Sequence, residues 1–144
     1  MHKLLEKLNN LKHDAEPAWG KMTPQHMIEH VVLTFQISYG KIKVECSTPP
    51  EKYPLMKKIL LSSRPLPKNF TNNVTGTELR NLEYASFQDA LKKLKIHVES
   101  FENYYSQNPD AVEINPTFGP LNREEWIQFH TKHLTHHLLQ FNLE

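Results

Sequence analysis

Apolar side chains recur at the spacing of an amphipathic helix in four segments of the chain. The first segment is short, residues 2–13, and Pro17 prevents its extension. The other three are long and cover residues 24–40, 87–107 and 123–140. At 1.5 Å per residue, each long helix would measure roughly 30 Å, a length typical of helical bundles. The pattern therefore predicts an all-α fold.

Capping residues mark the starts of the three long helices. Thr23 is a good N-cap, and Pro24 then occupies the first helical position. Ser86 precedes the helix over 87–107 in the same way. Asn122 is followed three residues later by Glu125, which is the spacing of a capping box. Caps and periodicity thus agree on where each helix begins.

About 45 residues separate the second and third of these helices, which is too long for a plain connection. Residues 53–61 read as a short helix bracketed by prolines. Residues 69–81 read as an extended, turn-rich strip with weak β character. We expect one four-helix-bundle domain over residues 1–144, with a long crossover over 42–84.

Composition narrows the classes of function. The chain has 144 residues, 38% of them apolar, which suits a single core. Lys plus Arg number 17 against 16 Asp plus Glu, so no basic excess points to nucleic acid. No apolar run reaches the roughly 18 residues of a membrane span, and we expect a cytoplasmic protein. Cys46 stands alone and is expected to be an inert thiol, and the sequons at Asn69 and Asn73 are expected to be unmodified.

Histidine is the compositional outlier. There are nine histidines, and four of them lie within eight residues: His130, His133, His136 and His137. On a helix that turns about 100° per residue, His133 and His137 lie one turn apart on the apolar face. That spacing lets two imidazoles reach one metal ion. His30, on the apolar face of the second helix, would supply a third ligand across the bundle.

Three neutral imidazoles leave coordination positions open, as in catalytic metal sites. Their softness favours zinc, nickel or ferrous iron over magnesium or calcium. A single histidine on an apolar face is more often a core residue, but burying three without a metal would cost about 1–3 kcal/mol for each unsatisfied group. The cluster therefore predicts a metal.

The remaining histidines are predicted to lie outside the first coordination sphere. His26 falls on the exposed first turn of its helix, and His136 lies on the shoulder of the apolar face. His130 is either an acid or base that acts beside the metal ligands or a residue of the solvent-exposed rim, and the rim is favoured. Surface or boundary positions are expected for the others: His2, His13 and His97.

Three segments carry a resemblance to a known family: residues 19–30, 118–126 and 132–141. Together they resemble the DinB-like superfamily, in a bacterial branch of uncharacterised domains. The resemblance implies a four-helix bundle that holds a metal through one histidine of the second helix and two of the fourth, here His30, His133 and His137. Better-studied relatives include metal-dependent hydrolases and transferases that use low-molecular-weight thiols. The long crossover departs from those relatives.

Two functions fit these features. In the first, the protein is an enzyme in which the metal lowers the pKa of water or of a thiol for attack on a small electrophilic substrate, and His130 moves the proton. In the second, the metal only joins two helices of a non-catalytic scaffold or homodimer module. Neither hypothesis involves nucleic acid or a membrane.

Overall fold

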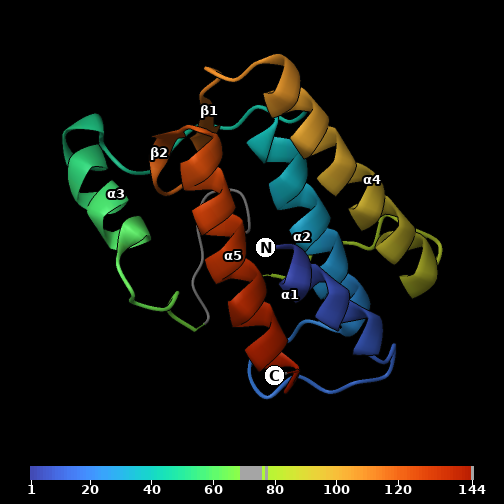
Figure 1. The fold of residues 1–144 in the computed structure, drawn as a ribbon. Coiled ribbons are helices and arrows are strands. Elements are labelled where there is room, and N and C mark those ends of the chain that lie inside the picture. The colour runs from blue at the N-terminus through green and yellow to red at the C-terminus, as the bar shows by residue number, and fades with distance from the viewer. Residues whose placement is uncertain (69–75, 77, 144) are drawn as a thin grey trace.

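The chain folds into a helical bundle with one small β-hairpin (Figure 1). The computed structural model describes residues 1–68, 76 and 78–143. Its helices are α1 (His2–Lys7), α2 (Pro24–Ser38), α3 (Tyr53–Leu61), α4 (Phe87–Gln107) and α5 (Arg123–Gln140). Short 3₁₀ turns cover Leu8–Asn10 and Pro50–Lys52, and the hairpin strands are β1 (Glu113–Asn115) and β2 (Gly119–Leu121). The predicted all-α class is confirmed.

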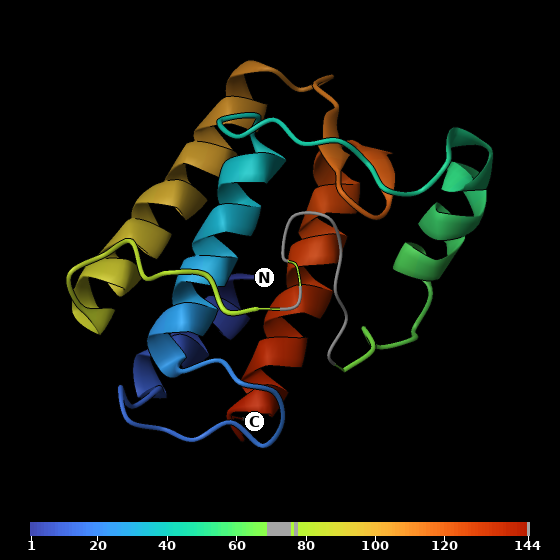
Figure 2. The same ribbon diagram turned by 180° about the vertical axis from the view of Figure 1, so that it is seen from behind.

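Helix α2 occupies the middle of the bundle, between α4 and α5 (Figure 1). Helix α1 packs on α5, near the C-terminus. Helix α3 stands on the opposite side of α5, beside the hairpin, and the view from behind in Figure 2 shows α3 and α4 at opposite sides of the molecule. No helix in the described part of the chain has both the length and the apolarity needed to cross a bilayer.

The predicted caps are present at the three long helices. The side chains of Thr23 and Ser86 each accept a hydrogen bond from a backbone N–H three residues later. Asn122 and Glu125 form the expected capping box, with both hydrogen bonds at 3.0 Å. These bonds satisfy N–H groups that the first turn of a helix leaves free. They explain why the predicted starts at residues 24, 87 and 123 agree with the structure.

The first helix is shorter than predicted. It ends at Lys7 instead of residue 13, and Leu11 is extended. Asn9 and Asn10 are poor helix formers because their side chains compete for backbone hydrogen bonds. The turn they form returns Leu11 to the core, where it is buried. Periodic leucines alone therefore overestimated the length of this helix.

The hairpin was not predicted. Its antiparallel register pairs Glu113 with Leu121 and Asn115 with Gly119. Gly119 has φ of +79°, and a Cβ there would lie 2.7 Å from the ring of Tyr53. Glycine thus allows the turn and the close packing of α3 against the hairpin.

The crossover contains the predicted helix over residues 53–61. Residues 69–75 and 77, which include both sequon asparagines and most of the extended strip predicted over 69–81, lie outside the described residues. Residues 76 and 78–81 are not in a strand.

Candidate metal centre

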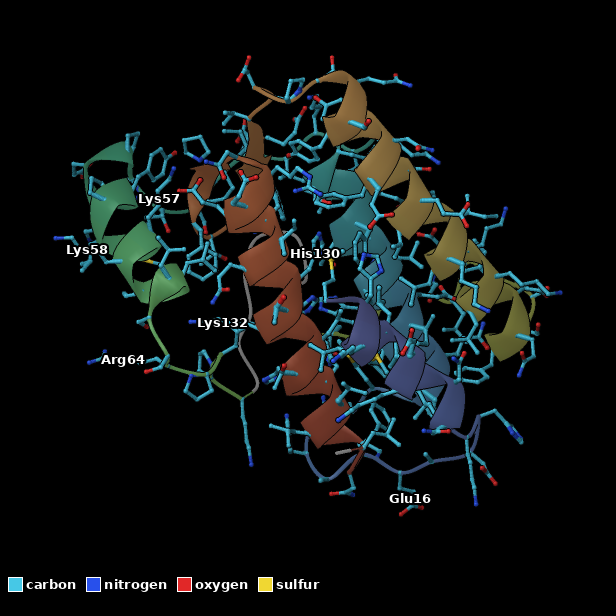
Figure 3. All side chains as sticks on the ribbon, in the orientation of Figure 1. Glu16, Lys57, Lys58, Arg64, His130 and Lys132 are labelled. Atoms are coloured by element: carbon cyan, nitrogen blue, oxygen red, sulfur yellow. The ribbon has the colours of Figure 1, made fainter. Side chains whose placement is uncertain are left out.

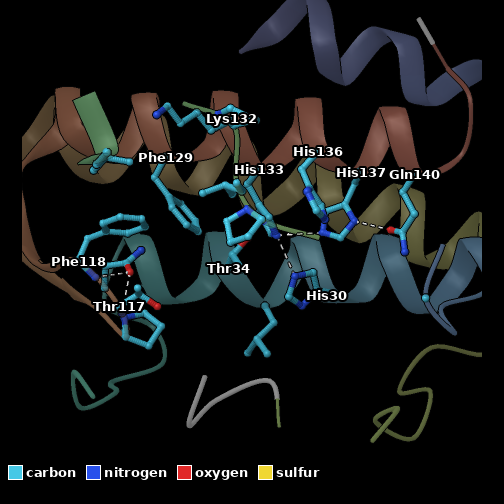
Figure 4. Close-up of a pocket in the computed structure, with 18 of the residues that line it drawn as sticks. His30, Thr34, Thr117, Phe118, Phe129, Lys132, His133, His136, His137 and Gln140 are labelled. Atoms are coloured by element: carbon cyan, nitrogen blue, oxygen red, sulfur yellow. Dashed lines mark hydrogen bonds between the residues drawn. The ribbon is translucent and has the colours of Figure 1, made fainter. Parts of the chain in front are cut away.

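Three imidazoles from two helices converge in the bundle. His30 projects from α2, and His133 and His137 project from α5 (Figure 4). The Nε2 atom of His133 lies 2.8 Å from Nε2 of His30 and 3.0 Å from Nε2 of His137. One ligand atom from each residue falls within 4.8 Å of the other two. The structure thus brings together the three histidines that the sequence singled out.

Helix geometry accounts for this convergence. His133 and His137 are one turn apart on the face of α5 that looks into the bundle, and both are buried. Their ring centroids are 4.6 Å apart. The ring of His30 meets both at centroid distances of 4.8 and 5.1 Å. The packing of α2 beside α5 therefore completes a set that neither helix could form alone.

Hydrogen bonds to Nδ1 of His133 and of His137 determine which ring nitrogen of each residue faces the cluster. Nδ1 of His137 donates to the side-chain oxygen of Gln140 at 2.8 Å. Nδ1 of His133 lies 3.5 Å from the hydroxyl oxygen of Thr34, whose own proton is donated to the carbonyl of Val31. These assignments follow from the hydrogen-bond network. They leave the Nε2 lone pairs of His133 and His137 facing each other.

Burial keeps these imidazoles neutral. Desolvation, assisted by charge repulsion from His136 and Arg80, lowers the pKa of His30 to about 4. Desolvation and the neighbouring histidines lower the pKa of His133 and of His137 well below the usual value. At neutral pH the cluster therefore presents uncharged nitrogen donors.

The donor set fits a transition-metal ion. Two Nε2 lone pairs that face each other at 3.0 Å repel unless a cation lies between them. Neutral imidazoles are good ligands for zinc, nickel and ferrous iron. In the part of the chain that the structure describes, this is the one such group of three or more histidine, cysteine or acidic side chains. The residues present are thus compatible with the metal that the sequence predicted.

The cluster forms part of the wall of a cavity of about 650 Å³. In Figure 4, Thr117 and Phe118 mark one end of this cavity, and His30, His137 and Gln140 mark the other. Phe129 lies between these ends. Most of the remaining wall is apolar, with contributions from Leu33, Ile37, Met56, Leu60 and Leu66. A small organic molecule can therefore reach the three imidazoles.

The prediction that His130 lies at a solvent-exposed rim was wrong. Its side chain is fully buried and points from α5 toward α2 (Figure 3). The ring stacks on Phe35 at a centroid distance of 3.8 Å and also contacts Phe101 and Trp126. His130 lies near the start of α5 but is not exposed, because α2 and α4 cover this turn of the helix.

His130 also lacks the contacts of an acid or base. Neither ring nitrogen has a hydrogen-bond partner among the described residues. Burial lowers the pKa of His130 to about 3, so the ring stays neutral. Within the described residues no hydrogen bond joins His130 to the three-histidine cluster, and its expected role in proton transfer stays a prediction.

Other histidines and the cysteine lie outside the cluster. His26 is partly exposed on the first turn of α2 and pairs with Thr23. His136 is half-buried, with its ring centroid 5.1 Å from that of His137. Cys46 is a free thiol away from this group.

Three further histidines were expected at the surface or at a boundary. His2 pairs with Glu102 at the surface, and His13 is exposed. The prediction for His97 was wrong: its side chain is buried, and its ring nitrogens find partners in the hydroxyl of Tyr39 at 2.8 Å and the amide of Gln36 at 3.1 Å.

Sequence reasoning missed two features of the site. Thr34 contacts the cluster, and its position one turn after His30 on the same helix was a usable signal for this contact. Asn115 and Trp19 line the cavity from segments outside the long helices. Nothing in helical periodicity indicates such residues, because tertiary packing alone brings them to the site.

The architecture and the site define a helical bundle with a candidate three-histidine metal centre. The family model of the DinB superfamily matches residues 1–141, and the chain belongs to this superfamily. Proteins of the superfamily commonly bind metal. No curated protein and no solved structure matches the chain.

Proposed function

We propose that this protein is a metal-dependent enzyme that activates water or a thiol for attack on a small electrophilic substrate. The observation that carries the proposal is the convergence of three Nε2 atoms on the wall of a 650 Å³ cavity. In the proposal, His30, His133 and His137 hold zinc, nickel or ferrous iron. The bound ion supplies Lewis acidity, which lowers the pKa of a coordinated water or thiol toward neutrality.

The chain's own residues prepare the site for this chemistry. Gln140 and Thr34 face the outer nitrogens of His137 and His133, so that each Nε2 keeps its lone pair. Contacts of this kind orient metal ligands and raise their basicity. Phe129 stacks on His133 at a centroid distance of 5.2 Å and limits water on that side. An apolar substrate body would pack against the same ring.

A purely structural metal is the competing function. Structural zinc sites usually have four protein ligands, whereas catalytic sites keep a position open. The converging group has three members among the described residues, and it borders a cavity large enough for an organic molecule. Both observations favour catalysis over a helix-joining role.

The test is a comparison of metal-loaded protein with a variant that lacks one histidine. Protein loaded with zinc, nickel or ferrous iron is assayed for hydrolysis of p-nitrophenyl acetate and for transfer of cysteine to chlorodinitrobenzene. We expect a metal-dependent rate that chelation or His133→Ala removes and that His26→Ala retains. His26 is a matched control because it is a histidine one turn before His30 on α2 and lies outside the cluster. Equal rates for wild type and His133→Ala with every metal would contradict the proposal.

A further inference from the structure

The positive charge of the chain is concentrated in one segment of the crossover. Residues 52–68 contain five of the 17 lysines and arginines, whereas all 16 aspartates and glutamates lie elsewhere. The remainder of the chain is therefore net acidic, although the net charge of the whole is +1. Clustered charge of one sign produces a local potential that attracts a partner of the opposite sign. The five cations are Lys52, Lys57, Lys58, Arg64 and Lys68.

Little of this positive charge is neutralised within the fold. Among the described residues, only one of the five cations, Lys57, pairs with a carboxylate, which lies on α5 at 2.9 Å. The ammonium group of Lys68 lies 4.1 Å from the ring centroid of Trp19. Figure 3 shows the side chains of Lys58 and Arg64 pointing away from the bundle. The charge of the segment is thus available to an external partner.

The exposed face of α3 is apolar as well as basic. Leu55 and Leu61 are 57% and 58% exposed, and Ile59 is 36% exposed. At about 100° per residue, these three side chains and Lys58 fall within one arc of about 160°. Leu60, on the other side of the helix, is fully buried. Helix α3 therefore packs one apolar side on the fold and leaves a second apolar side uncovered.

Contacts with α5 hold this segment in place. The ammonium group of Lys132 donates to the backbone carbonyl of Ile59 at 3.2 Å and to that of Arg64 at 2.8 Å. These bonds satisfy a carbonyl in the last turn of α3 and another in the turn that follows it. They also place a further positive charge beside Arg64. The surface is therefore formed before any partner binds, which lowers the entropic cost of binding.

The combination of charge and apolar exposure discriminates between partners. A symmetric dimer through α3 would bring the cations of two copies face to face, where like charges repel. Nucleic acid would pair with the cations but would leave the exposed leucines in water. An anionic lipid surface suits both components, because its headgroups attract lysine and arginine and its acyl boundary accepts apolar side chains.

We propose that α3 and the turn that follows it form a docking surface for an anionic lipid membrane. The exposed leucines enter the boundary between headgroups and acyl chains, and Lys52, Lys58 and Arg64 contact lipid phosphates. Met56 and Leu66 of the same segment line the cavity, so docking brings the cavity within about one helix diameter of the lipid. The docking requires no metal and goes beyond the proposed function.

Co-sedimentation with lipid vesicles tests this surface. Zinc-loaded and chelator-treated protein are each mixed with vesicles of phosphatidylcholine alone or of equimolar phosphatidylcholine and phosphatidylglycerol. We expect both forms of the protein to bind the anionic vesicles at least about tenfold more tightly than the neutral ones. Added salt should weaken the binding, because it screens the attraction between the cations and the headgroups.

Matched variants assign the binding to α3. Leu55→Ser removes an exposed apolar side chain and Lys58→Glu reverses a charge, and each should weaken binding to anionic vesicles at least about fivefold. Ile96→Ser and Lys95→Glu make the same changes at exposed positions of α4, on the opposite side of the molecule (Figure 2). Both controls should bind within about twofold of wild type. Circular dichroism confirms the fold of each variant.

Three results would overturn the inference. The first is binding to neutral and anionic vesicles that is equal or absent. The second is binding of Leu55→Ser and Lys58→Glu that is as tight as binding of the α4 controls. The third is self-association or binding to double-stranded DNA that Lys58→Glu abolishes while vesicle binding is unchanged, which would assign the surface to another partner.

Failure of the proposed function is distinct from these results. Vesicle binding without any metal-dependent rate would remove the enzyme and keep the docking surface. A metal-dependent rate without vesicle binding would do the reverse.

Discussion

The side-chain amide of Gln140 joins the histidine cluster to the segment that precedes α2. Its oxygen accepts a hydrogen bond from Nδ1 of His137 at 2.8 Å, and its nitrogen donates to the backbone carbonyl of Trp19 at 3.0 Å. The first bond orients an imidazole, and the second holds a cavity-lining residue against α5. One residue thus connects the candidate metal centre with the wall of the cavity.

Replacement of Gln140 separates these two roles. Gln140→Met removes the acceptor for His137 and should weaken metal binding about 10- to 100-fold. Gln140→Glu keeps an acceptor oxygen but loses the donor to Trp19, so its metal affinity should stay near that of wild type. Competition with a chromophoric chelator measures both affinities. Equal affinities for wild type and Gln140→Met would show that this hydrogen bond does not support metal binding.

His130 tests whether a buried histidine without partners is a structural liability. Both ring nitrogens are buried and unpartnered, and the ring stacks on Phe35. His130→Phe keeps an aromatic ring and removes two unsatisfied polar atoms, so we expect the free energy of unfolding to rise by about 1 kcal/mol. Urea unfolding measures it. A fall in stability together with a loss of the metal-dependent rate would instead restore a functional role for this imidazole.

The starts of the long helices and the shared face of two histidines could be predicted from the sequence. The caps at Thr23, Ser86 and Asn122 act within a single turn, so their effect on helix starts is visible in local sequence. That His133 and His137 lie on the same face also follows from the geometry of a single helix. Placement of His30 opposite them required an assumption about bundle packing, and the structure agrees with it.

The features that were missed depend on contacts between distant segments. The three-residue strands of the hairpin are too short for an alternating pattern, and their pairing is a tertiary event. The burial of His130 depends on Phe35 and Phe101, which come from other helices. Asn115 lies at the cavity because the whole hairpin turn packs there. Local periodicity carries no information on tertiary contacts between segments that are far apart in the sequence.

Acid should destabilise the metal-free protein. His30 has a folded-state pKa of about 4, against 6.5 for an unperturbed histidine, and the pKa of His130 is about 3. As pH falls below 6.5, the unfolded chain takes up protons that the folded chain does not, so the unfolded state is favoured. The free energy of unfolding, measured by urea titration after chelation, should therefore decrease from about pH 7 to about pH 5.

His130→Phe provides the control for this pH dependence, because it removes one of the titrating groups. Its free energy of unfolding should change less over the same interval. Stability that is constant or that increases as the pH falls would contradict the assignment of neutral, buried imidazoles.

Chelation should lower the thermal stability of the metal-loaded protein. An ion held by α2 and α5 binds the folded form and adds RT ln(1 + [L]/Kd) to its stability, which is about 2.7 kcal/mol at a free metal concentration of 100 Kd. Thermal unfolding followed by circular dichroism should show a lower Tm after chelation. The same treatment should leave the Tm of His133→Ala unchanged. Superimposable wild-type curves would exclude a metal bridge between the two helices.

The most direct test of the central claim is the metal content of the purified protein, measured by elemental analysis before any chelator is added. We predict about one zinc, nickel or iron ion per chain in wild type and in His26→Ala. His30→Ala, His133→Ala and His137→Ala should each lose the ion. Full occupancy in His137→Ala, or a wild-type protein that takes up no transition metal even when it is supplied, would contradict the assignment of this three-histidine cluster as a metal centre.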